Sequence, residues 1–279
     1  MSTPERRLGF SMRLALGAAL AAIIAILAVR HRALDRSGAL AAIIVGTLTF
    51  AAGGLAWSRA MIGFFVTGSL LSRVGRQRKR AAAIQGQRGQ RDARQVLANG
   101  GLAALFAALH SMSEQRSDWS LPFLGAIASA AADTWATEIG MLSAHPPRSL
   151  RTGRPVPPGT SGAVSLLGLL GMVAGASFVA LLAPRGTPRL PIAVAGCLGA
   201  LADSLLGATL QARYACAICQ RSLEQPAHPP CPGPARRVSG LPGLTNDAVN
   251  ALATLVGATL ASRLGYWTRR TSASRGSYR

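Results

Sequence analysis

Two carboxylates stand inside an apolar run of the sequence, and they constrain the fold more than any other feature. The run 125–140 reads GAIASAAADTWATEIG and contains Asp133 and Glu138. Ala, Ser, Thr and Gly make up most of the remainder, and such small residues let membrane helices approach one another closely. A carboxylate at the centre of a membrane helix costs about 2.5–3.5 kcal/mol on insertion scales. We therefore expect this helix to be enclosed by other helices and its acids to be functional.

The spacing of the acids predicts a wedge between two stripes of the same helix. At 100° per residue, Asp133 shares a stripe with Ser129 and Thr137, whereas Glu138 lies on a neighbouring stripe with Thr134. The two carboxylates are not stacked, and a cation such as a metal ion or an arginine is expected between them. A structural ion pair with a neighbouring helix is the alternative.

Composition indicates a membrane protein and argues against nucleic-acid binding. Of the 279 residues, 49% are hydrophobic and 14% are charged, which is too apolar for an ordinary soluble domain. The net charge of +20 would suggest nucleic acid in a soluble protein, but here the basic residues fall between apolar runs of membrane length. Aromatic residues make up 5% and do not alternate with basic ones, so we expect lipid and anionic partners and no nucleic acid.

The apolar runs predict an all-α fold, a polytopic membrane bundle of about seven or eight transmembrane helices. The expected spans are 14–29, 38–57, 60–71, 96–112, 121–143, 163–183, 191–210 and 244–264. The third is short, and we expect it to be tilted or re-entrant. The membrane domain is expected to cover 1–268 with a Cys- and His-containing connector at 212–242, followed by a disordered basic tail at 269–279.

The basic loop 73–94 sets the predicted orientation, because Lys and Arg favour the cytoplasmic side of a membrane. Alternation then places the connectors 30–37, 144–160 and 211–242 on the same side. Both basic termini would face outward, which the rule disfavours. The unusual polar motifs all fall at helix ends on this one face, so we predict a single site facing the cytoplasm of a bacterial-type cytoplasmic membrane.

Two further acids resemble Asp133 in their setting. Asp203 follows an alanine and precedes a serine in the seventh span, as Asp133 stands between Ala132 and Thr134, and Asp247 opens the eighth span. Carboxylates and amides form a hard oxygen ligand set that suits Mg²⁺ bridging phosphates. The candidate catalytic and Mg²⁺-binding residues are Asp133, Glu138, Asp203 and Asp247. Helix capping after Thr245 is the alternative role for Asp247 and its neighbour Asn246.

A glycine-rich turn predicts a phosphate site. The turn 159–162 reads GTSG and leads into the sixth span, where exposed N–H groups and the positive end of the helix dipole suit an anion. An ordinary loop is the alternative reading of so short a motif. The candidate substrate- and phosphate-binding residues are Asn99, Arg148, Arg151, Gly159, Thr160, Ser161, Gly162, Gln211, Asn246 and Asn250.

The last connector contains a cluster of metal-binding residue types. Cys216 and Cys219 form one pair, and His228 and Cys231 form a second. Thiolates and an imidazole on a cytosolic connector suit structural Zn²⁺, and a redox pair is the alternative. Cys197 lies inside an apolar run and is expected to be a packed core residue.

Together, these motifs resemble the integral-membrane family catalogued as domain of unknown function 92, which includes transmembrane protein 19 and the plant phytyl-phosphate kinase. The resembling segments are RALDRSGALAA (32–42), RQVLANGG (94–101), ASAAADTWATEIGMLS (128–143), GTSGAVS (159–165), ADSLLGATLQ (202–211) and NDAVN (246–250). The family commonly has glycine where this chain has Ala163. The resemblance implies phosphorylation of an isoprenyl monophosphate, and analogy with other membrane polyprenol kinases suggests a nucleoside triphosphate donor such as CTP.

The leading hypothesis is therefore a Mg²⁺-dependent phosphotransferase that acts on an isoprenoid alcohol or phosphate. The runner-up is a secondary transporter, because intramembrane acids and a possible repeat fit that class as well. Transporter sites lie near the membrane midplane, whereas these motifs lie toward one face, which favours the enzyme. A structural or assembly protein would leave the acids unexplained.

Overall fold

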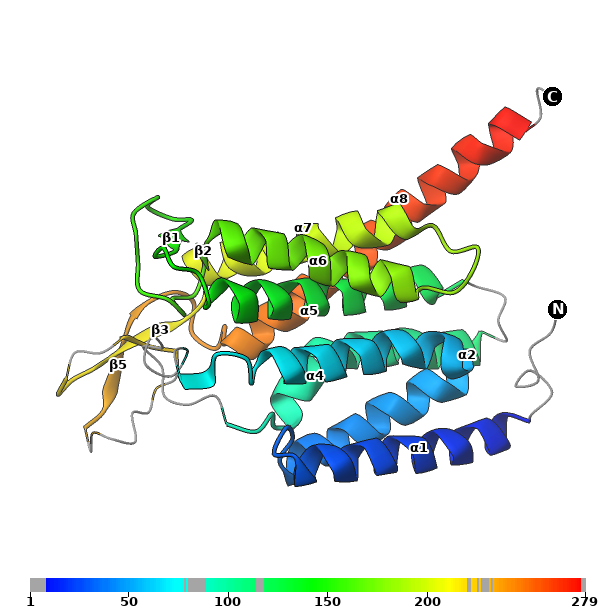
Figure 1. The fold of residues 1–279 in the computed structure, drawn as a ribbon, viewed down its shortest axis with the longest axis horizontal. Coiled ribbons are helices and arrows are strands. Elements are labelled where there is room, and N and C mark those ends of the chain that lie inside the picture. Colours follow the sequence, from blue (N-terminus) through cyan, green and yellow to red (C-terminus); the bar gives the residue numbers. More distant parts are fainter. Residues whose placement is uncertain are drawn as a thin grey trace.

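The apolar runs form long helices that lie side by side as a bundle (Figure 1), and the predicted all-α membrane class is confirmed. The computed structural model describes residues 9–77, 79, 89–113, 118–219, 222–224, 226, 231 and 233–276, with side chains described as far as residue 270. The helices of these residues are α1 (Phe10–Arg30), α2 (Arg36–Leu71), α4 (Ala93–Met112), α5 (Ser120–Gly140), α6 (Leu166–Leu182), α7 (Arg189–Thr209) and α8 (Asn246–Gly276).

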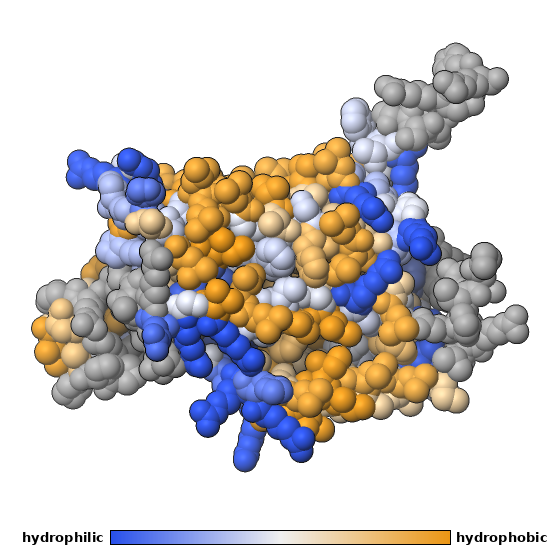
Figure 2. Space-filling model, viewed as in Figure 1, coloured by the Kyte–Doolittle hydropathy of each residue, from blue (hydrophilic) through white to orange (hydrophobic). Residues whose placement is uncertain are grey.

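The surface of the bundle is that of a membrane protein. By length and composition, four of the described helices could cross a bilayer: α1, α2, α7 and the Asn246–Arg270 part of α8. α6 is apolar as well but has only 17 residues. Figure 2 shows apolar side chains over the body of the helices and hydrophilic ones gathered toward its ends.

The helix α2 folds back on itself at Gly54. That residue has φ 55° and ψ −150°, a left-handed conformation that glycine adopts without a steric penalty. Gly38 and Gly68 both lie against Arg91, although a straight helix would separate them by about 45 Å. The two arms are therefore antiparallel (Figure 1), and they correspond to the predicted second and third spans. The boundary at 57–60 was wrong, because the glycine pair at 53–54 bends the chain earlier and lengthens the second arm.

The helix α5 is the centre of the bundle, as its small residues predict. It packs against α2, α4, α6, α7 and α8, and every residue of 121–132 is buried. Gly125 faces Gly257 of α8 so closely that a Cβ atom on Gly125 would lie 2.4 Å from the Gly257 carbonyl oxygen. The Ser129 hydroxyl donates to the carbonyl of Ala253 in α8 at 3.0 Å. Small side chains thus bring α5 and α8 into backbone contact.

The two small antiparallel sheets, which lie between α5 and α6 and between α7 and α8, are at one end of the bundle, called the connector end here (Figure 1). The first pairs β1 (Arg148–Ser149) with β2 (Ala163–Val164). The second has the order β4–β3–β5 and consists of β3 (Arg213–Cys216), β4 (Ser222–Leu223) and β5 (Ala235–Ser239). The connector from α1 to α2 joins this end through the hydrogen bond from the Asp35 N–H to the Arg91 carbonyl, 3.1 Å long.

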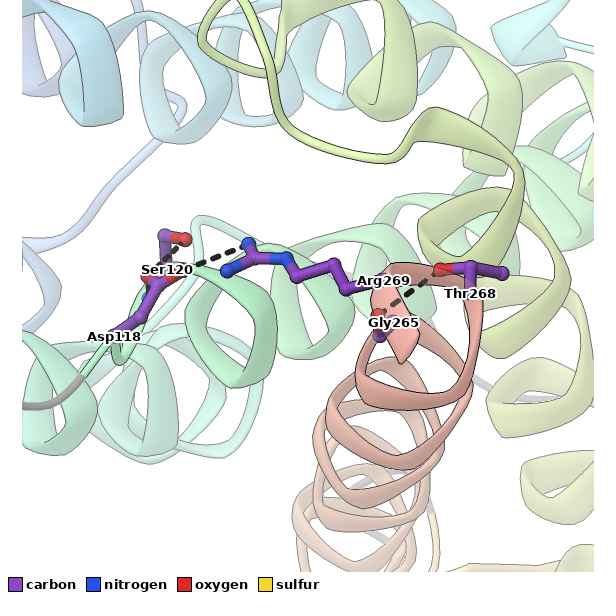
Figure 3. A network of polar contacts seen from close by, with 5 residues as sticks. All are labelled: Asp118, Ser120, Gly265, Thr268 and Arg269. Carbon is purple, nitrogen blue, oxygen red and sulfur yellow. Dashed lines mark hydrogen bonds and ion pairs between the residues drawn. The ribbon is translucent and has the colours of Figure 1, made fainter. Parts of the chain in front are cut away.

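An ion pair links two chain segments at the opposite end. Arg269 of α8 donates to Asp118, which precedes α5, with 2.8 Å between Nη2 and Oδ2 (Figure 3). Burial alone would raise the pKa of Asp118, but hydrogen bonds from Ser120 and the charge of Arg269 outweigh it, so this pKa is lowered. Any stability from the pair is therefore present at neutral pH and is lost as the pH falls through the lowered pKa.

The backbone of α8 stays helical through Gly276, which overlaps the tail expected to be disordered. Residues 277–279 lie outside the described part of the chain. The division into a membrane domain and a tail remains a prediction.

Candidate functional site

A cavity of about 1250 Å³ opens among the connectors and reaches down between the helices. Residues from α1, α2, α4, α5, α6, α7 and α8 line it, together with the loop 158–165. Ten of the predicted site residues contribute to its wall: Asn99, Asp133, Glu138, Gly159, Thr160, Ser161, Gly162, Asp203, Asn246 and Asn250. Motifs that lie far apart in the sequence therefore share one cavity.

Asp133 and Asp203 lie in the half of their helices nearest the connectors. Seven residues separate Asp133 from the end of α5, and six separate Asp203 from the end of α7. At a rise of 1.5 Å per residue, both acids are about 10 Å below the connector ends of these helices. Both side chains are partly buried, at a depth that a ligand entering among the connectors can reach.

Glu138 has a cationic partner. The Lys79 ammonium lies 2.7 Å from Glu138 Oε2 and also donates to the Leu71 carbonyl at 2.7 Å. The exposed fractions of the two side chains are only 8% for Lys79 and 11% for Glu138. A cation was expected beside the acids of α5. For Glu138, this cation is Lys79, which follows α2. A role for Glu138 as a Mg²⁺ ligand remains a prediction.

The turn 159–162 rests on the end of α7. Gly162 has φ 70°, and a Cβ atom on it would lie 2.3 Å from the backbone nitrogen of Ala208. Only glycine fits there, because both the left-handed backbone and the close approach exclude a side chain. Arg213 ties the two segments together by donating to the carbonyls of Ser161 at 2.8 Å and Gly207 at 2.9 Å.

The polar groups of this turn differ in their availability. The Ser161 hydroxyl donates to Glu224 of the connector and lies 3.3 Å from Gln211 Oε1. The backbone N–H groups of Ser161 and Gly162 make no hydrogen bond within the described residues. These two donors remain available to an anion.

The relation of the turn to α6 differs from the prediction. α6 begins at Leu166, after β2, and the Ser165 hydroxyl accepts the Gly168 N–H at 3.1 Å. The helix is thus capped by its own serine, and the turn lies upstream of its N-terminus. Since the short strand β2 intervenes, the turn is separated from the N-terminus of α6, and anion binding at the turn remains a prediction.

The start of α8 places amides in the cavity. The Thr245 hydroxyl accepts the Ala248 N–H at 3.3 Å, which is the capping contact. Capping therefore belongs to Thr245, and the side chains of Asn246 and Asn250 line the cavity. Asp247 is not among the lining residues and interacts electrostatically with Asp92, Arg94 and Glu224.

Three other predicted residues do not reach the cavity wall. The Arg148 guanidinium donates to the Gly153 carbonyl at 3.0 Å, and both Arg148 and Arg151 are exposed on the β1 hairpin. Gln211 is buried behind the turn. A phosphate-binding role for these three residues remains a prediction, and their positions in the structure do not support it.

The basic residues that do line the cavity were not singled out from the sequence. They are His31, Arg32, Arg73, Arg76, Lys79 and Arg91. Arg73 donates to the His31 carbonyl at 2.8 Å, and the Arg91 guanidinium lies 5.9 Å from the centre of the Phe65 ring. For Lys79, the sequence contained one indication of a special role, because it is the only lysine of the chain. For the arginines, only the folding of the connectors decides which of many face the cavity.

The Cys-rich connector brings three thiols together. The sulfur atoms of Cys216, Cys219 and Cys231 all lie within 4.8 Å of one another. Burial and, after it, the neighbouring thiols of Cys219 and Cys216 together raise the pKa of the Cys231 thiol to about 11. A metal ion must therefore displace protons to bind here. The predicted fourth ligand, His228, lies outside the described residues.

Comparison with known proteins extends the resemblance over most of the chain. Protein PGR of Arabidopsis thaliana is 30% identical, with 94% of this chain and 97% of that protein covered. An uncharacterised membrane protein of Methanocaldococcus jannaschii is 32% identical over 72% of this chain and 84% of its own length. The chloroplast protein VTE6 of Arabidopsis thaliana is 29% identical over 64% of this chain and 56% of its own length.

No solved structure matches the chain at a significant level. The family model described as integral membrane protein DUF92 matches residues 19–258, which include every residue that lines the cavity. The chain therefore belongs to the DUF92 family of integral membrane proteins.

Proposed function

We propose that this protein is a Mg²⁺-dependent kinase that transfers the terminal phosphoryl group of a nucleoside triphosphate to an isoprenoid lipid phosphate. The observation that supports this best is that residues of one cavity supply acids from two helices, amides from a third, two backbone N–H groups that donate no hydrogen bond among the described residues, and a basic rim. Phosphoryl transfer depends mainly on positioning and charge neutralisation, and these groups supply both.

Asp133 and Asp203 are the residues that would hold Mg²⁺. They offer carboxylate oxygens from α5 and α7, and Asn246 and Asn250 add amide oxygens from α8. This donor set fits a hard cation that keeps several waters. When bound, the metal would neutralise charge on the phosphates.

The turn and the rim would hold the phosphates. The N–H groups of Ser161 and Gly162, which donate no hydrogen bond among the described residues, would bind the anion as successive backbone donors of a turn. Arg73 and Arg91, both in the connector between α2 and α4, supply positive charge. Glu224 contacts the Ser161 hydroxyl, so we expect a bound phosphate to displace this carboxylate.

The reaction requires no general base in this cavity. An oxygen of the acceptor monophosphate is already anionic, and it would form a bond to the terminal phosphorus as the bond to the leaving nucleoside diphosphate breaks. The lipid identity rests on the family resemblance to phytyl-phosphate kinase. The site would face the cytoplasm, where nucleoside triphosphates are available.

Direct assay tests this proposal. Purified protein is incubated with Mg²⁺, terminally labelled nucleoside triphosphates and a panel of prenyl alcohols and monophosphates. We expect label in a lipid diphosphate, with CTP among the effective donors, and none when Mg²⁺ is chelated. Absence of lipid-linked label from every pair would refute the kinase and favour the transporter.

For the connector, we propose a structural Zn²⁺ bound by Cys216, Cys219, Cys231 and His228. The mutual sulfur distances fit one tetrahedral ion with Zn–S bonds of about 2.3 Å. Such an ion would order the connector that places Glu224 beside the turn. A short connector with few apolar side chains would obtain its free energy of folding from metal binding.

We expect purified protein to contain one zinc per chain and Cys216→Ser to lose it, as measured by elemental analysis. Cys197→Ser is the matched control, because Cys197 lies within α7, packs against residues of α5 and α6, and does not belong to the thiol cluster. Zinc-free native protein, or a Cys216→Ser variant that keeps its zinc, would exclude this site.

A further inference from the structure

The cavity has a second, apolar end that the chemistry of phosphates does not use. Beyond the polar groups, its wall continues along α1, the two halves of the bent helix α2, and α4. Ala21, Val45 and Met61 are among the residues that line this part. These residues lie about 14–15 Å from the connector ends of their helices at 1.5 Å per residue. This apolar end of the cavity, called the apolar arm below, therefore reaches about half-way through a hydrocarbon core that is about 30 Å thick.

Polar and apolar ends meet on α4. Asn99 and Gly100 are consecutive, and both line the cavity. A Cβ atom on Gly100 would lie 3.4 Å from Val45 Cγ1 and 3.8 Å from Met61 Sδ, so a methyl group just fits between the walls. Any longer side chain at Gly100 would enter the arm.

The next residue, Gly101, faces a different direction. A Cβ atom there would contact only Leu97 of the same helix, at 3.6 Å, and Gly101 lines a separate shallow groove with Leu105 and Leu252. The same substitution at 100 and at 101 therefore fills the arm in one case and leaves it open in the other.

Two isoleucines mark where the arm would meet the bilayer. Ile24 of α1 and Ile62 of α2 belong to its wall, and neither is buried: Ile62 is 36% exposed and Ile24 is half-buried. We expect a hydrocarbon chain to enter the arm from the membrane between these side chains while its charged head stays at the polar end.

We infer that the apolar arm holds the hydrocarbon chain of an isoprenoid monophosphate, and that Gly100, Val45 and Met61 limit the chain length. This inference rests on the proposed kinase function for the position of the phosphate. The flexible thioether of Met61 lets the wall adjust to methyl branches. A short prenyl group would fill only the first part of the arm, above Gly100.

The test compares Gly100→Leu with Gly101→Leu, using isopentenyl, geranyl, farnesyl and geranylgeranyl monophosphates as acceptors. We expect Gly100→Leu to raise KM for geranylgeranyl phosphate by about ten- to two-hundredfold, the scale of one or two methylenes in an apolar pocket. KM for isopentenyl phosphate should change little, and Gly101→Leu should resemble wild type with every acceptor. Val45→Phe, which fills the arm from the facing wall, should repeat the pattern if Gly100→Leu does not fold.

A binding measurement separates this inference from the kinase proposal. Labelling of the protein by a benzophenone-bearing geranylgeranyl phosphate needs no turnover, and we expect Gly100→Leu to lower it relative to Gly101→Leu. Equal labelling of the two variants, or equal changes in KM for all chain lengths, overturns the arm even if phosphate is transferred. Selective loss of labelling in a protein that transfers no phosphate supports the arm and refutes only the kinase.

Discussion

Asp133→Asn is expected to abolish phosphoryl transfer while the protein still inserts and folds. The change keeps the shape of the side chain but removes the anionic oxygen that would bind the metal. We expect a loss of at least about a hundredfold in kcat, the scale observed when one group that stabilises a charged transition state is removed. Stability should not fall, because an amide is less costly than a carboxylate inside a membrane. Steady-state kinetics and the thermal unfolding midpoint in detergent measure the two effects.

The matched control is Asp118→Asn, the same chemical change at the opposite end of the bundle. Asp118 pairs with Arg269 (Figure 3), and neither residue lines the cavity, so its replacement should leave transfer intact. Asp203→Asn should behave like Asp133→Asn, because both acids line the same cavity. Normal turnover in Asp133→Asn and Asp203→Asn would show that these acids are structural.

The sequence predicted the centre of the fold and ten of the residues that line the cavity. The run 125–140 could be recognised as an enclosed helix, because small residues have no use on a lipid-facing surface. Asp133, Asp203 and Ser161 could be placed together because helix direction alternates, so that every polar motif fell at one end. These inferences depend only on helix length, direction and composition, which are local properties of the chain.

Contacts between segments that are far apart in the chain could not be predicted from the sequence. The partner of Glu138 comes from Lys79, 59 residues earlier, in a basic loop that offered many arginines as alternatives. The contact between Glu224 and Ser161 depends on how the Cys-rich connector folds back. The apolar arm had no signal either, because a Val or Met that lines a cavity and one that faces lipid look alike in a membrane helix.

The second large effect is expected from breaking the buried pair of Lys79 and Glu138. With 2.7 Å between Nζ and Oε2 and little exposure of either side chain, removal of one partner leaves the other charged group buried. Such a change typically costs about 3–5 kcal/mol. We therefore expect Lys79→Met and Glu138→Gln each to lower the thermal unfolding midpoint clearly.

The double variant Lys79→Met/Glu138→Gln should recover most of that loss, because it leaves neither charge uncompensated. A coupling between the two changes on the order of 0.5–3 kcal/mol is expected for residues in contact. The exposed pair of Asp118 and Arg269 is the control, since an ion pair with both side chains about half exposed contributes only about 0–1 kcal/mol. Additive losses at Lys79 and Glu138 would contradict the pairing.

Transfer activity of the same double variant decides what Glu138 does. If Glu138 only holds the end of α5 against the segment that follows α2, the recovered double variant should phosphorylate lipid at a rate close to that of wild type. If Glu138 also binds Mg²⁺ from its cavity-facing side, the double variant will be stable and inactive, and its activity will not respond to added Mg²⁺. Stability and activity are thus read separately on one protein. The first outcome is expected, because the ammonium of Lys79 already lies where a cation beside Glu138 would be needed.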